Sequence, residues 1–212
     1  MQTLDRQRRI VALAAAGIAG FVDATGFLAA DRYFVSFMSG NTTRLGADLA
    51  TSPGTAWFPA LLIAGFVAGV TGGALLAQAA RTRRKAAVLT LTAGLLAVAA
   101  SGAMLAWPTV AIMLVLVAAM GVLNNTFQRQ GEVAVGLTYM TGALVRMGQG
   151  VAARIAGRGD GGWIAWLALW VALAVGGLCG AMTWREIGMA GLWLPAIAAA
   201  LLAVFAGRLR SA

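Results

Sequence analysis

The sequence predicts an all-α integral membrane protein with six transmembrane helices and two short re-entrant or broken helices, built as an inverted 3+3 internal repeat. Three observations predict this: a very apolar composition, six long apolar runs, and two polar, glycine-containing stretches that resemble each other. The 212 residues are 60% hydrophobic and only 11% charged, and the mean hydropathy is +0.83. Because a soluble domain carries roughly 25% charged residues, we expect the lipid bilayer to be the chain's main partner.

Six apolar runs reach the ~20 residues with which a helix crosses ~30 Å of hydrocarbon. The first follows basic residues, as in a signal peptide, but it continues through Asp23 to Ala30, so we expect a retained span. Trp107 and Pro108 separate the third and fourth runs, and a proline that ends one helix and begins the next predicts a tight hairpin. The runs are 10–30, 57–80, 86–107, 109–128, 163–183 and 188–207.

Two shorter segments, 36–51 and 138–157, lie between these runs. The first offers about 10–12 helical residues after an N-cap at Ser39 or Asn41, and ~18 Å of helix is too short to span. The second is longer, but Arg146 and other polar residues make it a poor lipid-facing span. We expect both segments to enter the membrane and return on the same side.

The basic residues orient the chain. With a cytoplasmic N-terminus and six spans, only Arg32 and Arg185 lie in outside loops, whereas a full crossing by 36–51 would place the run 81–85 outside. We therefore expect both termini in the cytoplasm. The clustering of arginines at the ends of apolar runs also argues against nucleic-acid binding. The inside residues are Arg6, Arg8, Arg9, the run 81–85, Arg129, Arg158, Arg208 and Arg210.

An internal repeat relates two halves, about 10–107 and 109–207, of one membrane domain spanning 1–212. Each half contains three spans, so the second half enters the membrane from the opposite side, as in many transporters and some channels. The spacing in sequence between matched residues increases from 101 to 107 positions along the chain. The matches are Gly20-Phe21-Val22-Asp23 with Gly121-Val122-Leu123-Asn124, Met38-Ser39-Gly40 with Met140-Thr141-Gly142, Arg44-Leu45-Gly46 with Arg146-Met147-Gly148, and Gly69 and Gly73 with Gly176 and Gly180.

Polar residues of the repeated stretches are the candidate solute-binding residues. Irregular backbone at membrane depth must face protein or a wet cavity, and a helix start carries the positive end of the helix dipole. These groups either bind a polar or anionic solute near the midplane, or are capped by Ser39, Asn41 and Thr141 and only shape a turn. The candidates are Asp23, Ser39, Gly40, Asn41, Arg44, Asn124, Thr141, Gly142 and Arg146.

Three of these candidates carry charge. Arg44 has Asp48 four residues on, the spacing of a structural ion pair, whereas Arg146 has no acid at that spacing. The two arginines either reach a membrane interface or point at a shared central cavity. Asp23 is either a cation or proton site or the counter-charge of an arginine such as Arg44.

Two functional classes remain open. The leading hypothesis is a transporter or channel for a small polar or anionic solute; the alternative is a structural or regulatory membrane protein whose polar motifs only hold the bundle together. We expect no enzyme, cofactor or metal site, because there is no His, no catalytic pattern and a single cysteine, Cys179, in an apolar run. Five glycines suit close packing inside the bundle or between protomers of a homo-oligomer: Gly65, Gly69, Gly73, Gly176 and Gly180.

The two polar stretches also carry a family resemblance. Gly20 to Ala24 followed by Phe34 to Thr42 resembles the YoaK-like family, catalogued as domain of unknown function 1275, and Asn124-Asn125 followed by Thr138 to Gly142 is similar too. Ser39 stands where the family more often has Thr, and Leu123 where a Gln is expected. The resemblance implies a bacterial inner-membrane protein of about six spans, and it implies no particular substrate.

Overall fold

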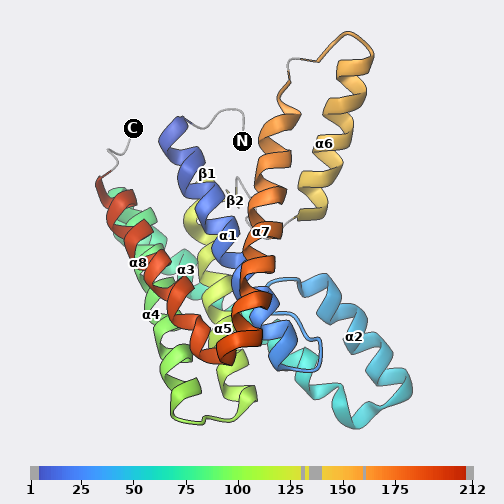
Figure 1. Cartoon of the computed structure of the whole chain (residues 1–212), viewed down its shortest axis with the longest axis vertical. Coiled ribbons are helices and arrows are strands. Elements are labelled where there is room, and N and C mark those ends of the chain that lie inside the picture. Colours follow the sequence, from blue (N-terminus) through green and yellow to red (C-terminus); the bar gives the residue numbers. More distant parts are fainter. Residues whose placement is uncertain (1–4, 130–131, 134–139, 160, 209–212) are drawn as a thin grey trace.

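The computed structural model describes residues 5–129, 132–133, 140–159 and 161–208, and in Figure 1 they form a helical bundle. Besides the helices, the described residues contain one antiparallel pair of two-residue strands, β1 (Gln128–Arg129) and β2 (Glu132–Val133). The helices are α1 (Arg6–Ala29), α2 (Met38–Thr51), α3 (Trp57–Ala80), α4 (Arg84–Met104), α5 (Thr109–Leu123), α6 (Met140–Ile155), α7 (Trp163–Ile187) and α8 (Trp193–Arg208).

Four continuous helical stretches among the described residues are long and apolar enough to cross a membrane: Arg6–Ala29, Pro53–Met104, Thr109–Thr126 and Trp163–Arg208. The second and fourth have 52 and 46 residues, more than the ~20 that one crossing needs. Each contains two α-helices, joined through Arg81–Arg83 in one case and Gly188–Leu192 in the other. Left-handed backbone at Arg81 (φ 45°) and Gly188 (φ 58°) turns the chain at both joints.

The expected hairpin between the third and fourth apolar runs is confirmed. Helix α4 ends at Met104 and α5 begins directly after Pro108, which has no N–H to leave unpaired. The N–H of Trp107 donates to the carbonyl oxygen of Gly102, and the indole packs on that glycine. The turn is therefore closed by a backbone hydrogen bond and an aromatic ring.

Helix α1 packs along α7, and α3 packs along α5, with glycine at the crossing points in both pairs. A methyl group on Gly20 would overlap the carbonyl oxygen of Leu173, and one on Gly176 would overlap that of Gly17. Only glycine permits such backbone contact, which dispersion forces and lipid entropy favour in a bilayer. The same arrangement recurs where Gly69 meets Ala118 and Gly121 meets Phe66.

These crossings bear on one of the two expected uses of the repeated glycines, packing inside the bundle. Gly69, Gly73, Gly176 and Gly180 lie against helices of their own chain, and Gly65 lies against side chains of α5. The glycines therefore serve packing inside the bundle.

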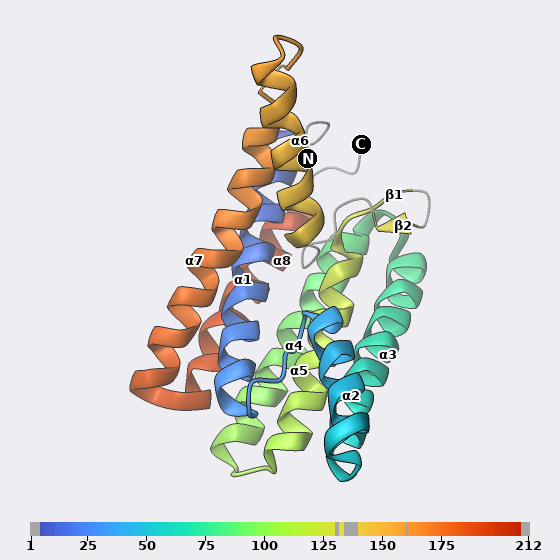
Figure 2. The same ribbon diagram turned by 90° about the vertical axis from the view of Figure 1, so that its right-hand side faces the viewer.

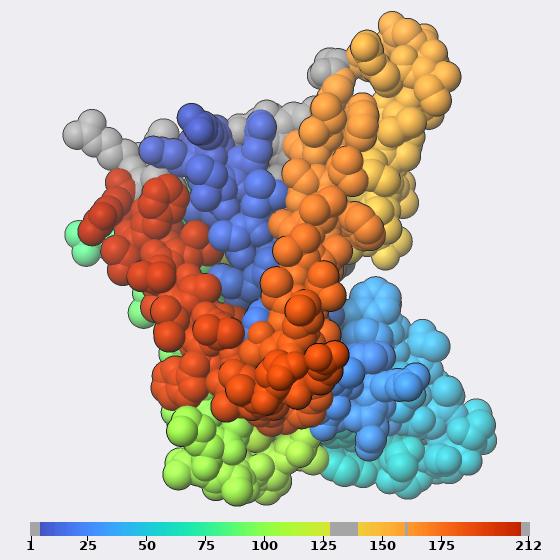
Figure 3. Space-filling model, viewed as in Figure 1, coloured from blue at the N-terminus to red at the C-terminus, as the bar shows by residue number. Residues whose placement is uncertain are grey.

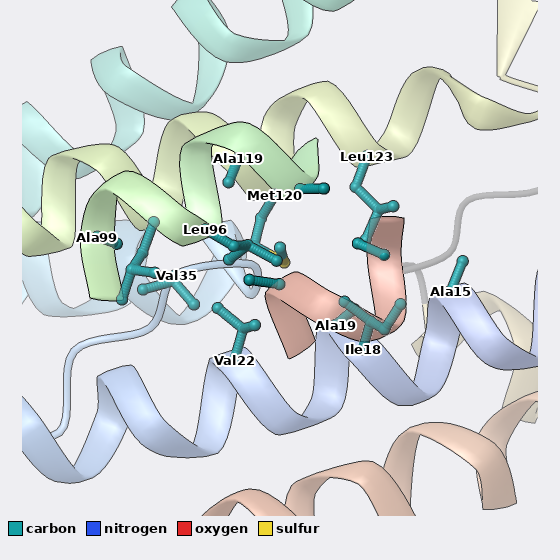
Figure 4. Close-up of a cluster of buried hydrophobic side chains, with 14 of the residues drawn as sticks. Ala15, Ile18, Ala19, Val22, Val35, Leu96, Ala99, Ala119, Met120 and Leu123 are labelled. Carbon is teal, nitrogen blue, oxygen red and sulfur yellow. The ribbon is translucent and has the colours of Figure 1, made fainter. Parts of the chain in front are cut away.

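The centre of the bundle is a cluster of small and branched apolar side chains from α1, α4 and α5, shown in Figure 4. Leu96 and Met120 are fully buried in it. Val35, from the segment between α1 and α2, inserts into the same cluster and is also fully buried. Burial of Val35 fixes this irregular segment against the core, which sets the start of α2.

The outward face of α7 is apolar and exposed. Val175, Leu178 and Met182 are 53%, 62% and 61% exposed, and α7 forms part of the near surface in Figure 3. In water such a patch would be an association hazard, but hydrocarbon solvates it. The exposed face of α7 is therefore consistent with contact to lipid.

Replacement of Gly176 by alanine tests the α1–α7 contact. The added methyl overlaps the backbone of Gly17, so Gly176→Ala should lower the free energy of unfolding by about 1–3 kcal/mol in detergent. Gly177→Ala is the matched control, because its methyl would lie 3.6 Å from the carbonyl oxygen of Gly20, an ordinary contact. Equal thermal stability of the two variants would contradict this packing.

Candidate functional site

The segment between α1 and α2 is held by two polar side chains. One carboxylate oxygen of Asp23 accepts hydrogen bonds from the backbone N–H groups of Val35 (2.9 Å) and Ser36 (3.0 Å). Asn41, which is fully buried, accepts from the N–H of Phe34 at 3.0 Å and donates to its carbonyl oxygen at 2.7 Å. Backbone groups outside a helix thus find partners inside the protein, as a low-dielectric environment requires.

This arrangement corrects the expected start of α2. The helix begins at Met38 with Phe37 at the N-cap position, and no side chain caps it. Ser39 is exposed, and Asn41 turns back to Phe34 instead of capping. The helix can start earlier than expected because Asp23 already orders the two residues that precede Phe37. Gly40 is required sterically, since a side chain there would overlap the Phe34 and Phe37 rings.

Arg44 and Asp48 do not form the expected ion pair; Tyr33 stands between them. The Arg44 guanidinium carbon lies 4.4 Å from the centroid of the Tyr33 ring, and the Tyr33 hydroxyl donates to Asp48 at 2.9 Å. Arg44 also donates to the carbonyl oxygen of Asp31 at 3.3 Å. A cation–π contact and two hydrogen bonds therefore fasten α2 to the segment that precedes it.

Asp23 is likewise not the counter-charge of Arg44. Its carboxylate accepts from backbone N–H groups, and no ion pair between the two side chains occurs within the part of the chain that the structure describes. A carboxylate that accepts two such hydrogen bonds acts as the cap of an irregular segment. Sequence reasoning placed Asp23 correctly beside the polar stretch but did not foresee this partner.

The second stretch is described from Met140 onward; Thr138 and Tyr139, which the family resemblance included, lie outside the described residues. Thr141, Gly142 and Arg146 are exposed along α6. The Arg146 guanidinium carbon lies 4.8 Å from the ring centroid of Trp166 on α7. Arg146 therefore packs on an aromatic face, as Arg44 does, but from a more exposed position.

Asn124 and Asn125 end α5 as buried residues. Asn124 donates to the carbonyl oxygen of Met120 at 2.9 Å, and Asn125 donates across to the carbonyl oxygen of Val70 on α3 at 3.0 Å. A hydrogen bond between helices holds α3 to α5 in an environment without competing water. Asn125 was not among the expected site residues, although two adjacent asparagines at the end of an apolar run were a visible signal.

The two short helices begin near mid-height of the bundle and run to opposite ends, α2 beside α3 and α6 beside α7 (Figures 1 and 2). Figure 3 shows the surface hollowed between them. The structure brings Asp23, Asn41 and Arg44 together around one segment, and it places Thr141, Gly142 and Arg146 on another. No hydrogen bond or ion pair among the described residues joins the two groups. No cluster of potential metal ligands occurs there either.

Removal of the Asn41 side chain tests the polar clamp. Asn41→Ala leaves the N–H and carbonyl of Phe34 without these partners, so we expect a loss of about 1–3 kcal/mol in the free energy of unfolding. Thr43→Ala is the control on the same helix, because Thr43 is exposed and its hydroxyl bonds only to the carbonyl of Ser39. A stability of Asn41→Ala equal to that of the control, measured by thermal unfolding in detergent, would contradict the clamp.

Comparisons with known proteins agree with the apolar helical architecture. Residues 11–205 match the family described as "Protein of unknown function (DUF1275)". A UPF0700 transmembrane protein of Rhizobium meliloti (strain 1021) is 38% identical over 211 residues, which cover 94% of this chain and 91% of the relative. No solved structure matches. The family match across nearly all of the chain, the transmembrane relative and the apolar helices together identify this chain as a membrane protein of the DUF1275 family.

Proposed function

We propose that this protein is a transporter or channel for a small polar or anionic solute, with six membrane spans, α2 and α6 as re-entrant helices, and a solute site between the starts of those two helices. The observation that carries the proposal is the placement of α2 and α6. Both begin near mid-height and diverge, so the positive ends of two helix dipoles face the middle of the bundle (Figures 1 and 2). Interrupted helices that meet near the midplane typically form the solute sites of transporters.

The packing of the long helices supports an inverted 3+3 repeat. Gly20 meets Leu173, and Gly121 meets Phe66. The two glycines differ by 101 positions and their two partners by 107, which are the offsets of the sequence repeat. The crossing of α1 with α7 thus has its counterpart in the crossing of α5 with α3. Such an exchange is expected if a two-fold axis in the membrane plane relates the halves.

The solute class follows from the polar groups that remain exposed. Near the helix starts these are the hydroxyls of Ser39 and Thr141 and, one turn further along α6, the guanidinium of Arg146. Asp23 contributes no such group, because its carboxylate accepts backbone hydrogen bonds. Hydroxyls, a guanidinium and helix starts favour a neutral polar or anionic solute over a cation.

One observation favours the alternative function. Asp23, Asn41 and Arg44 all engage the segment from Asp31 to Ser36, which is what a purely structural motif would do. A structural or regulatory membrane protein would therefore share this first half. The two functions differ in whether the hollow between α2 and α6 conducts a solute.

Flux through liposomes separates these functions. Gly142→Leu fills space at the start of α6, where a side chain would meet nothing within 4 Å. We expect it to lower the flux of a permeant solute from a panel of small anions and neutral polar compounds at least roughly tenfold, as a constriction does. Gly148→Leu is the matched control, on the same helix and equally open, and should conduct like the wild type. Absence of flux for the whole panel, or equal flux in the two variants, would contradict the proposed solute passage.

The proposed inner-membrane orientation, with both termini cytoplasmic, rests on the basic residues at the end where α1 begins and α8 ends, among them Arg6, Arg8, Arg83 and Arg208. In a Cys179→Ser background, we expect Arg83→Cys to react with a membrane-impermeant maleimide only after the inner membrane is opened. Glu186→Cys, at the opposite end with a 68% exposed side chain in the wild type, should react from the periplasm. The reverse labelling pattern would overturn the orientation.

A further inference from the structure

A pocket of about 340 Å³ lies where α1 ends and where α3 and α5 begin, away from the hollow between α2 and α6. This volume falls within the range of small-molecule sites in proteins. Its lining comes from three segments far apart in the sequence: Ala29, Ala30, Asp31 and Tyr33; Thr55, Trp57 and Phe58; and Thr109 and Val110. The pocket therefore exists only in the folded bundle.

Three aromatic rings form a continuous wall of this pocket. The rings of Tyr33 and Phe58 meet edge to face with centroids 4.9 Å apart, and those of Phe58 and Trp57 lie 5.5 Å apart. Tyr33 is nearly buried, whereas Trp57 is 55% exposed and so remains accessible to a ligand. Aromatic faces carry partial negative charge and attract cations, tryptophan most strongly.

Asp31 is the one charged residue of the lining. Its side chain is exposed, and within the described chain its carboxylate has no ion pair or hydrogen bond; only its backbone oxygen is engaged, by Arg44. The backbone at Asp31 (φ 42°) and Arg32 (φ 65°) is left-handed at two successive non-glycine residues. Such strain persists only where surrounding contacts hold it, and it is often found at functional sites.

The neighbouring positive charges lie outside the lining of the pocket. Arg44 lies over the Tyr33 ring and bonds to the backbone of Asp31, and neither Arg44 nor Arg32 belongs to the lining. The lining thus combines one negatively charged side chain with three aromatic side chains. This combination recognises ammonium groups.

We propose that this pocket binds the ammonium group of a small amine or of a lipid headgroup. Aromatic rings stabilise a quaternary or primary ammonium, and the Asp31 carboxylate supplies the counter-charge. The site lies at the end of the bundle, where lipid headgroups and soluble amines both have access. The inference does not depend on transport, because binding here requires no passage through the protein.

Calorimetry on the full chain in an uncharged sugar detergent tests the site, with choline as the probe. The uncharged analogue 3,3-dimethylbutan-1-ol has the same shape and should bind at least roughly tenfold more weakly, since it lacks the charge that the rings and the carboxylate attract. Equal affinity for the two compounds, or no binding of choline, would overturn the proposal.

Two variants locate the binding. Asp31→Asn keeps a residue that tolerates left-handed backbone, and it should weaken choline binding at least roughly tenfold and reduce the preference over the uncharged analogue. Trp57→Leu should weaken choline as well, through loss of an accessible ring. Glu186→Gln is the matched control, an exposed acid that pairs with Arg185 and lies outside the lining. An effect of Glu186→Gln equal to that of Asp31→Asn would refute the site.

Nanodiscs identify the natural source of the ammonium group. If phosphatidylethanolamine discs weaken choline binding relative to phosphatidylglycerol discs, the site holds a lipid headgroup. If the two lipids give equal affinity, the site holds a soluble amine. Both results support an ammonium site, and loss of choline binding in both kinds of disc would contradict it.

Discussion

A backbone that leaves a helix inside a packed bundle must find hydrogen-bond partners within the protein, and the rest of this structure depends on how that requirement is met. Between α1 and α2, one carboxylate and one amide are enough: Asp23 accepts from Val35 and Ser36, and Asn41 pairs with both backbone groups of Phe34. With these partners, the chain can turn within the bundle and start α2 near mid-height. The expected sequence repeat matches Asn124 with Asp23, and there an uncharged amide that can also donate corresponds to an acceptor-only carboxylate.

Much of the helical architecture could be predicted from the sequence, because apolar runs and breakers determine it locally. Each of the six apolar runs overlaps an α-helix, and the run 57–80 coincides with α3. Pro108 immediately precedes the first residue of α5, and Gly188 ends α7 with left-handed backbone, and both effects depend on a single residue. The repeated glycines also predicted close helix packing, since such packing in lipid requires small residues at a fixed spacing.

The contacts of the polar residues could not be predicted, because their partners are distant in sequence. Helical spacing pointed from Arg44 to Asp48, yet the side chain that links them is Tyr33, 11 and 15 positions away. Asn41 is a residue type that is common at helix N-caps, but Asp23, on α1, orders the residues that precede α2 by accepting their backbone hydrogen bonds. Sequence spacing describes neighbours on one helix, whereas the shape of a turn between helices decides which polar groups meet.

The crossing of α1 with α7 has a consequence for how the chain is made. Helix α1 is synthesised well before its partner α7, since α1 ends at Ala29 and α7 begins only at Trp163. Helix α3 is separated from its partner α5 by a much shorter stretch of chain, because α5 begins at Thr109. During synthesis, the glycine face of α1 must therefore remain unpaired in lipid, or bind a temporary partner, until α7 has been made. Residues that precede α7 therefore cannot complete the α1–α7 contact by themselves.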